Sequence, residues 1–220
     1  MKNFIFQNIS LLKGVGEKTK KLLKKKKIEK VSDLLWNLPQ DFTDRSNVKK
    51  LDNLELGKIT TIKVKVIKYN FPRIRNLPNK ISCEDEMGKI DIIFFNSREG
   101  YIRKVLPLNK EVIISGKINF YKNNYQISNP TYIKEEQNKN QIMKVFPKYS
   151  LTEGLTEKTY RNIITNILNK LNDKDDWYTD KFLKKNKFNN LQETLLRLHN
   201  PSKKIELQSN DYRRLAYDEI

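Results

Sequence analysis

The hydrophobic spacing of this chain changes twice along its length, and this change restricts the possible folds more than any other feature. Ile62, Val64 and Val66 alternate with Lys63 and Lys65, which is the period of a half-buried strand. The segments before and after the middle carry apolar residues at helical spacing instead. The sequence therefore predicts an α+β protein with an N-terminal helical segment, a β-rich middle and a C-terminal helical segment. The expected boundaries are 1–54, 55–137 and 138–220.

The middle segment contains five predicted strands. A hairpin turns at Met87-Gly88, and a short helix is expected over about residues 97–105, between the third and fourth strands. Gly116 lies where a barrel strand must bend, and Asn123-Asn124 suits the last hairpin turn. Five strands with a helix after the third is the order of an OB-fold, a small barrel that commonly binds single strands. Alternation alone also fits other small barrels.

Two adjacent phenylalanines, Phe94 and Phe95, end the third predicted strand. Successive side chains on a strand point to opposite faces, so the two rings cannot both enter one core. An outward ring beside basic residues would form a platform on which nucleic-acid bases stack. The alternative is that both rings are buried, one in the barrel and one beneath a neighbouring helix. Nearby aromatic and basic residues are Tyr101, Phe120, Tyr121, Tyr125, Lys89, Arg98, Arg103, Lys117 and Lys122.

Two further basic regions have both a DNA-binding and a purely structural interpretation. The proline-containing insertion between the first two strands predicts an exposed loop whose Arg73, Arg75 and Lys80 either contact a phosphate or remain solvated. Near the N-terminus, "LLKGVGEKTKKLL" predicts a tight turn before a helix that starts near Glu17. Backbone N–H groups at such a start can bind a phosphate, which is the pattern of a helix-hairpin-helix. An ordinary capped turn is the alternative. The residues concerned are Lys13, Gly14, Val15, Gly16, Lys18, Lys20 and Lys21.

Charge indicates a polyanionic partner, and composition excludes several kinds of enzyme. The 44 basic and 26 acidic residues give a net charge of +18, although AT-rich codon bias toward lysine accounts for part of it. The single histidine, His199, and the single cysteine, Cys83, allow neither a His/Cys zinc cluster nor an internal disulfide. His199 is interpreted as the end of a helix just before Pro201. No glycine belongs to a P-loop pattern, so we expect no catalytic residue, metal or cofactor here. The composition does not exclude a catalytic site made of carboxylates alone.

The C-terminal segment is predicted to form two amphipathic helices, and no part of the chain is predicted to span a membrane. Thr156 is expected to cap an amphipathic helix, and a second, shorter helix follows. No apolar run approaches the ~18 residues needed to span a bilayer, and the N-terminus carries no cleavable signal, which predicts a cytoplasmic protein that does not contact membrane. We also expect a monomer. The two apolar faces consist of Tyr160, Ile163, Ile164, Ile167, Leu168 and Leu171, and of Leu191, Leu195 and Leu198.

The ordered set of motifs resembles the N-terminal wedge region of the RecG family of ATP-dependent DNA helicases. The matching stretches are "LLKGVGEKTKKLL", "VSDLLWNLPQDFTDR", "IDIIFFN", "VIISGKI", "YQISNPTYI", "PKYSLTEGLTEKTYRNII", "LQETLLRLHNPS" and "RRLAYDEI". The resemblance implies an OB-fold wedge that enters the branch point of stalled replication forks and Holliday junctions during DNA repair and recombination. In that family, aromatic side chains near a Phe-Phe-Asn motif stack on unpaired bases. The motif falls on Phe94, Phe95 and Asn96, and the family's following tyrosine on Tyr101 after a longer spacer, so the resemblance implies nucleic-acid contacts at Phe94, Phe95 and Tyr101.

In that family, the stretch similar to "RRLAYDEI" leads into two motor domains that use ATP and Mg. These domains are missing from the 220 residues, so we expect a fragment of a longer helicase or a truncated gene product. The partners implied by the resemblance are branched or single-stranded DNA, with the motor domains in cis if the gene product is longer. The alternatives are a free-standing OB-fold protein that binds single-stranded DNA or RNA, and an adaptor whose aromatic patch binds protein.

Overall fold

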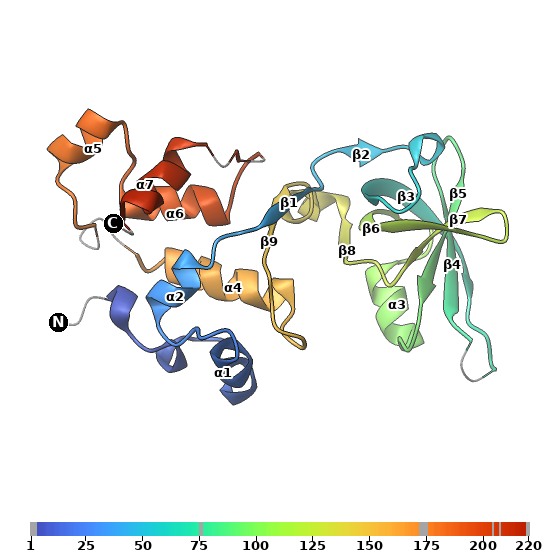
Figure 1. The fold of residues 1–220 in the computed structure, drawn as a ribbon. Coiled ribbons are helices and arrows are strands. Elements are labelled where there is room, and N and C mark those ends of the chain that lie inside the picture. Colours follow the sequence, from blue (N-terminus) through green and yellow to red (C-terminus); the bar gives the residue numbers. More distant parts are fainter. Residues whose placement is uncertain (1–3, 75–76, 172–175, 204, 207, 219–220) are drawn as a thin grey trace. The chain divides into compact units, whose positions relative to one another are not determined.

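The computed structural model describes residues 4–74, 77–171, 176–203, 205–206 and 208–218 (Figure 1). They form two compact units. One unit combines Met1–Thr43 with Val145–Ile220, and the other is Asp44–Lys144. The N-terminal and C-terminal helical segments therefore share one unit, whereas the sequence-based division follows changes of secondary structure along the chain.

The unit Asp44–Lys144 is built around a closed barrel (Figure 1). β5 pairs in parallel with β7, and β3 closes the barrel by pairing antiparallel with β6. This strand order, with one helix after the third strand, confirms the predicted OB-fold. The barrel elements are β3 (Ile59–Asn70), β4 (Asn79–Glu84), β5 (Lys89–Phe94), α3 (Glu99–Val105), β6 (Glu111–Tyr121) and β7 (Asn124–Ser128).

Two short strands and two 3₁₀ segments complete this unit. β2 (Val48–Lys49) pairs in parallel with β3, and β8 (Tyr132–Glu135) pairs antiparallel with β6. The 3₁₀ segments are Leu51–Asn53 and Glu136–Gln141.

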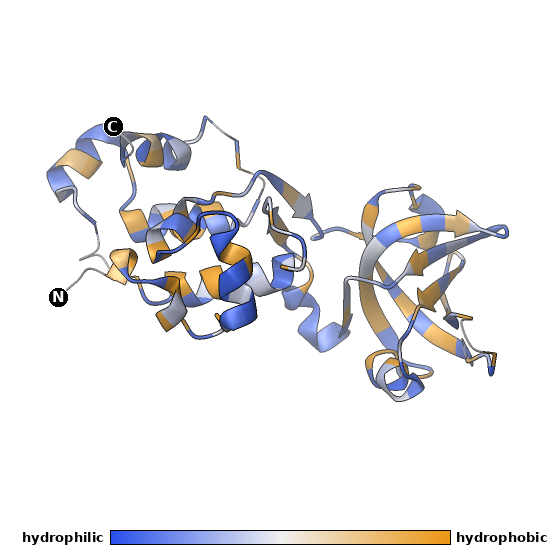
Figure 2. Ribbon diagram, turned by 60° about the horizontal axis from the view of Figure 1, so that its bottom comes forward, coloured by the Kyte–Doolittle hydropathy of each residue, from blue (hydrophilic) through white to orange (hydrophobic). Residues whose placement is uncertain are grey.

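The predicted alternation in β3 is confirmed. Ile62, Val64 and Val66 are buried in the barrel, while the side chain of Lys65 is exposed and that of Lys63 partly so. Apolar residues recur along the barrel strands in Figure 2, as they must when one face of each strand lines a core. The core closes with apolar side chains from every barrel strand and from α3.

The last hairpin turns one residue earlier than predicted. Tyr121 pairs with Asn124, so the two central residues are Lys122 and Asn123 rather than Asn123-Asn124. Both have positive φ, 48° and 64°, which a two-residue hairpin turn of type I′ requires. Asparagine adopts this conformation readily, but nothing in the side chain of lysine predicts it.

The helical unit contains the remaining elements. Thr156 caps α4 by accepting a hydrogen bond from the Thr159 N–H, as predicted. Both predicted apolar faces are buried in the core of this unit. Its elements are α1 (Glu17–Lys24), α2 (Val31–Trp36), α4 (Glu157–Leu168), α5 (Asp180–Asn186), α6 (Leu191–His199), α7 (Asn210–Asp218), 3₁₀ turns at Phe4–Phe6 and Ile9–Leu11, and the paired strands β1 (Asp41–Asp44) and β9 (Val145–Lys148). No helix in the described ranges is both long and apolar enough to cross a membrane.

His199 is a buried structural residue at the end of α6. Its Nε2–H donates to the Leu35 carbonyl at 2.8 Å, so the neutral ring leaves Nδ1 to accept from the Tyr149 hydroxyl at 2.9 Å. Burial lowers the pKa of His199 to about 4. The ring therefore joins α2, α6 and the segment after β9 as a neutral group.

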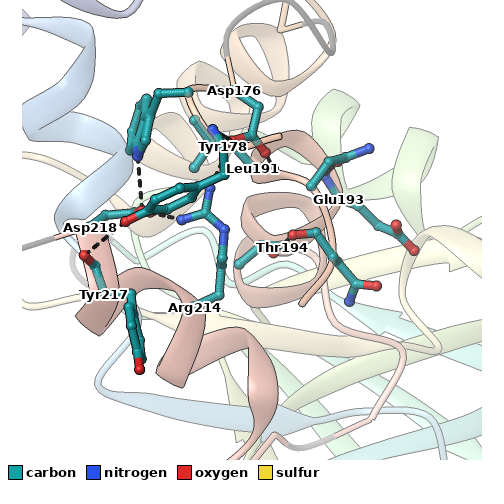
Figure 3. Close-up of polar contacts among 11 residues, drawn as sticks. Asp176, Tyr178, Leu191, Glu193, Thr194, Arg214, Tyr217 and Asp218 are labelled. Atoms are coloured by element: carbon teal, nitrogen blue, oxygen red, sulfur yellow. Dashed lines mark hydrogen bonds and ion pairs between the residues drawn. The ribbon is translucent and has the colours of Figure 1, made fainter. Parts of the chain in front are cut away.

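A buried arginine fastens α7 to the segment that precedes α5 (Figure 3). Arg214 Nη2 lies 2.9 Å from Asp176 Oδ1, and Nη1 donates to Asp218. The guanidinium carbon lies 4.4 Å from the ring centroid of Tyr178, while Trp177 Nε1 donates to Asp218 at 3.1 Å. Burial raises the pKa of Asp218, and the Arg214 contact opposes that rise. Because breaking a buried pair leaves a charge uncompensated, this network stabilises the docked position of α7.

We predict that Gly116→Ala destabilises the barrel. A Cβ at this position would lie 2.4 Å from Cγ2 of Ile127, and overpacking of this kind typically costs about 1–3 kcal/mol of the free energy of unfolding. Gly100→Ala is the matched control, because no atom lies within 4 Å of its added Cβ and a helical alanine is favoured. Urea unfolding of the two variants measures the difference. Equal stability of Gly116→Ala and the wild type would contradict the barrel packing.

We also predict that His199 makes the helical unit less stable in mild acid. The unfolded chain binds a proton near pH 6.5, whereas the folded ring resists protonation until about pH 4. Stability from this residue is thus complete above pH 6.5 and is lost as the pH falls toward 4. The loss is on the order of 3 kcal/mol. Denaturant unfolding of wild type and His199→Gln across this range measures it, and parallel pH profiles would contradict it.

Candidate nucleic-acid interface

The two adjacent phenylalanines take opposite positions. Phe94 is 4% exposed and packs in the barrel core, whereas Phe95 is 48% exposed. The alternative in which both rings are buried is therefore wrong. The nucleic-acid contact that the resemblance implies for Phe94 is also wrong, because a ring enclosed by the core offers no face to a base. Phe95 keeps a face available.

Hydrogen bonds with two asparagine side chains hold the loop that carries Phe95. The Phe95 N–H donates to Asn129 Oδ1 at 3.0 Å, and Asn79 Nδ2 donates to the Ser97 carbonyl at 2.8 Å. Between them, Asn96 turns the chain with a φ of 58°. Sequence reasoning missed both asparagines, since neither belongs to the Phe-Phe-Asn motif and their contacts join distant segments. The loop is thus fixed while its ring stays exposed.

Phe95 lies beside a groove on the outer face of the barrel. The groove has a volume of about 630 Å³ and is also lined by Tyr121 and Lys122 from the β6–β7 hairpin and by Leu77 from the β3–β4 loop. Ile93 and other residues of β4, β5 and β7 contribute to its lining. In OB-folds, oligonucleotides bind on the face of the second and third strands, between these same two loops. Phe95, Tyr121 and Lys122 thus lie together at the position where OB-folds bind oligonucleotides.

Two lysines of this groove lie close to other groove residues, one to a carboxylate and one to an aromatic ring. Lys80 Nζ lies 2.7 Å from Asp91 Oδ2, and Ser82 Oγ donates to Asp91 Oδ1 at 3.0 Å, so the lysine charge is locally balanced. Lys122 Nζ lies 5.5 Å from the ring centroid of Tyr121. Aromatic walls beside a balanced ion pair suit stacking on a base.

The other predicted residues of the barrel unit lie outside the groove lining. Tyr101 lies on α3 and Arg98 immediately precedes this helix, and both side chains are exposed. Arg73 is exposed in the β3–β4 loop, and Arg75 lies outside the described residues. The structure therefore does not place Tyr101 and Arg98 together with Phe95 and Tyr121 on one groove.

Arg103 belongs to a stack that the sequence did not predict. Its guanidinium carbon lies 4.7 Å from the ring centroid of Tyr69 and 4.9 Å from that of Phe71. The two rings stack on each other with 5.2 Å between centroids. This arrangement connects α3 to the first residues of the β3–β4 loop and holds the start of that loop against the helix.

The glycine turn belongs to the helical unit. α1 starts at Glu17 as predicted, Gly14 has a φ of +93°, and no hydrogen bond from a described side chain caps the helix at Gly16. Val15 is buried, so the turn offers a nucleic acid its backbone rather than this side chain. The element before the turn is the 3₁₀ segment Ile9–Leu11, not an α-helix.

Lysines surround this turn. Lys13 and Lys18 are exposed, and Lys20 is partly exposed with its Nζ 3.5 Å from Glu17 Oε1. An exposed pair at this distance contributes little energy, so Lys20 can exchange its partner for another anion.

Comparisons with known proteins agree on one family. The family model described as the RecG wedge domain matches residues 8–171. The chain is 29% identical to the ATP-dependent DNA helicase RecG of Thermotoga maritima, covering 97% of this chain and 27% of that protein. It is 30% identical to RecG of Staphylococcus aureus, covering 89% of this chain and 29% of that protein.

A solved structure gives the same result. The structure of RecG bound to a three-way DNA junction matches with a TM-score of 0.80 and 28% identity, covering 97% of this chain and 30% of that one. The chain thus spans less than a third of the length of these relatives. Because the family model covers most of the chain and the fold agrees throughout, the chain belongs to the RecG wedge domain family.

Proposed function

We propose that the chain is the branched-DNA-binding wedge portion of a RecG-like ATP-dependent DNA helicase. The observation that carries this proposal is the exposed Phe95 ring beside the aromatic groove of an OB-fold. The relative solved with a three-way DNA junction supports a branched substrate. In the whole protein, motor domains in cis would bind ATP and Mg and drive remodelling of stalled forks and Holliday junctions in DNA repair. We expect a monomer that works in the cytoplasm.

The wedge acts in three physical steps. The excess of basic residues captures DNA by releasing counterions from its phosphates. The Gly14–Gly16 turn and its lysines hold a phosphate at the start of α1. Phe95 then stacks on an unpaired base at the branch, with Tyr121 along the groove. Tyr101 and Arg98 contact DNA from the α3 side of the barrel.

Substrate preference distinguishes this proposal from its alternatives. A wedge binds a fork more tightly than an equal length of single strand, whereas a free-standing OB-fold protein does not. An adaptor that binds protein through its aromatic patch would show a DNA affinity that hardly depends on salt, because few counterions would be released.

Phe95→Ala should remove most of the preference for a fork over a linear duplex. Base–aromatic stacking is worth roughly 1–3 kcal/mol, which corresponds to about a 5- to 150-fold loss of fork affinity. Fluorescence anisotropy titrations with fork, duplex and single-stranded DNA measure it. Phe120→Ala is the matched control, because Phe120 is 49% exposed but packs edge-on against Tyr125 and does not line the groove. Equal losses in both variants would refute the role of Phe95.

Replacing Lys13 and Lys18 together by glutamine should weaken binding to fork and duplex alike. The slope of log affinity against log salt is negative, and each lost phosphate contact reduces its magnitude by about 0.9, so the double variant should reduce the magnitude by up to about 2. Titrations at several salt concentrations measure this slope. The control is the double replacement of the exposed Lys25 and Lys27, which lie past the end of α1. If both pairs reduce the slope equally, the turn has no special part in binding.

A further inference from the structure

The backbone on both sides of Phe94 is fixed by one residue, Asn129. Its side-chain Oδ1 accepts from the Phe95 N–H at 3.0 Å, and its own N–H donates to the Ile93 carbonyl at 2.7 Å. Phe94 lies between these two bonds and is buried in the core. The exposed ring of Phe95 therefore extends from a backbone that has little freedom to turn.

Asn129 is itself mounted on the barrel. The Thr131 N–H donates to the Ser115 carbonyl of β6 at 3.0 Å. Pro130 approaches Gly116 so closely that a Cβ on that glycine would lie 3.4 Å from the Pro130 Cα. The residues that follow Asn129 therefore contact β6, while Asn129 itself bonds to the end of β5.

Few residue types can occupy this position. Asn129 has a φ of 44°, in the left-handed region where asparagine, aspartate and glycine are tolerated and most side chains are strained. The same residue must place an acceptor oxygen at the Phe95 N–H, which glycine cannot do. Asparagine and aspartate satisfy both conditions.

We propose that Asn129 is a positioning residue that holds the Phe95 ring ready to stack on an unpaired base. This inference rests on the proposed function, because it assigns Asn129 a part in the same contact. A ring on a free loop would have to be ordered when DNA binds, and that lost freedom would weaken the complex. Because the hydrogen bond already fixes the backbone at Phe95, less conformational entropy is lost when DNA binds.

Two substitutions separate the hydrogen bond from the backbone conformation. Asn129→Gly keeps the positive φ and removes the acceptor, whereas Asn129→Asp keeps both. The readout is the ratio of fork to linear-duplex affinity on the full 220-residue chain. The added charge of aspartate weakens binding to both DNAs and leaves that ratio largely unchanged. Each variant is prepared with Phe95 and with Phe95→Ala, and thermal unfolding is recorded for all.

We expect Asn129→Gly to reduce the fork preference several-fold, by no more than Phe95→Ala does, and Asn129→Asp to retain it. With Phe95→Ala already present, Asn129→Gly should change the ratio no further, because no ring remains to be positioned. The proposal is overturned if Asn129→Gly keeps the full preference, or lowers it by the same factor with and without the ring. If Phe95→Ala itself leaves the preference intact, the proposed function fails instead.

A second measurement needs no variant. Hydrogen exchange of the Phe95 amide should be slow in the wild-type chain without DNA, since the amide donates a hydrogen bond to Asn129 Oδ1. Exchange at the rate of an exposed loop would overturn the proposal even if Asn129→Gly failed to fold.

Discussion

The alternation of side chains along β5 is the constraint on which the candidate interface depends. Phe94 fills the barrel core, so the next residue must point the other way, and Phe95 stays 48% exposed. An exposed ring contributes little to the stability of the fold. Asn129 accepts a hydrogen bond from the Phe95 N–H and Asn79 donates one to the Ser97 carbonyl, and these bonds hold the loop that carries the ring. The fold thus presents an aromatic side chain on a surface that suits stacking with an unpaired base.

The helical unit contains buried polar contacts in addition to its apolar core. His199 bridges the Leu35 carbonyl and the Tyr149 hydroxyl as a neutral ring, and Arg214 pairs with Asp176 and Asp218. Both residues lie in stretches that resemble the family, yet neither is placed to contact DNA. Their contacts join α6 to α2 and α7 to the segment that precedes α5.

Local patterns predicted most of the fold. The alternating strands, the helix after the third strand, the Thr156 cap and both apolar faces depend on neighbours in sequence, and the structure agrees with them. The site was harder, because Phe95 and Tyr121 meet only when β5 and the β6–β7 hairpin come together. Asn129 and Arg214 act over 34 and 38 residues, beyond the reach of any periodicity. The turn at Lys122 requires a positive φ, which the identity of a lysine residue does not predict.

The central claim is that the Phe95 ring stacks on an unpaired base at a branch. The most direct test is the fluorescence of 2-aminopurine placed at the branch point of a fork, recorded at saturating protein and compared with the same base inside a duplex arm. We predict that the wild-type chain changes the fluorescence only at the branch, and that Phe95→Ala, also at saturation, removes this change while Phe120→Ala retains it. An identical signal from wild type and Phe95→Ala would contradict the account.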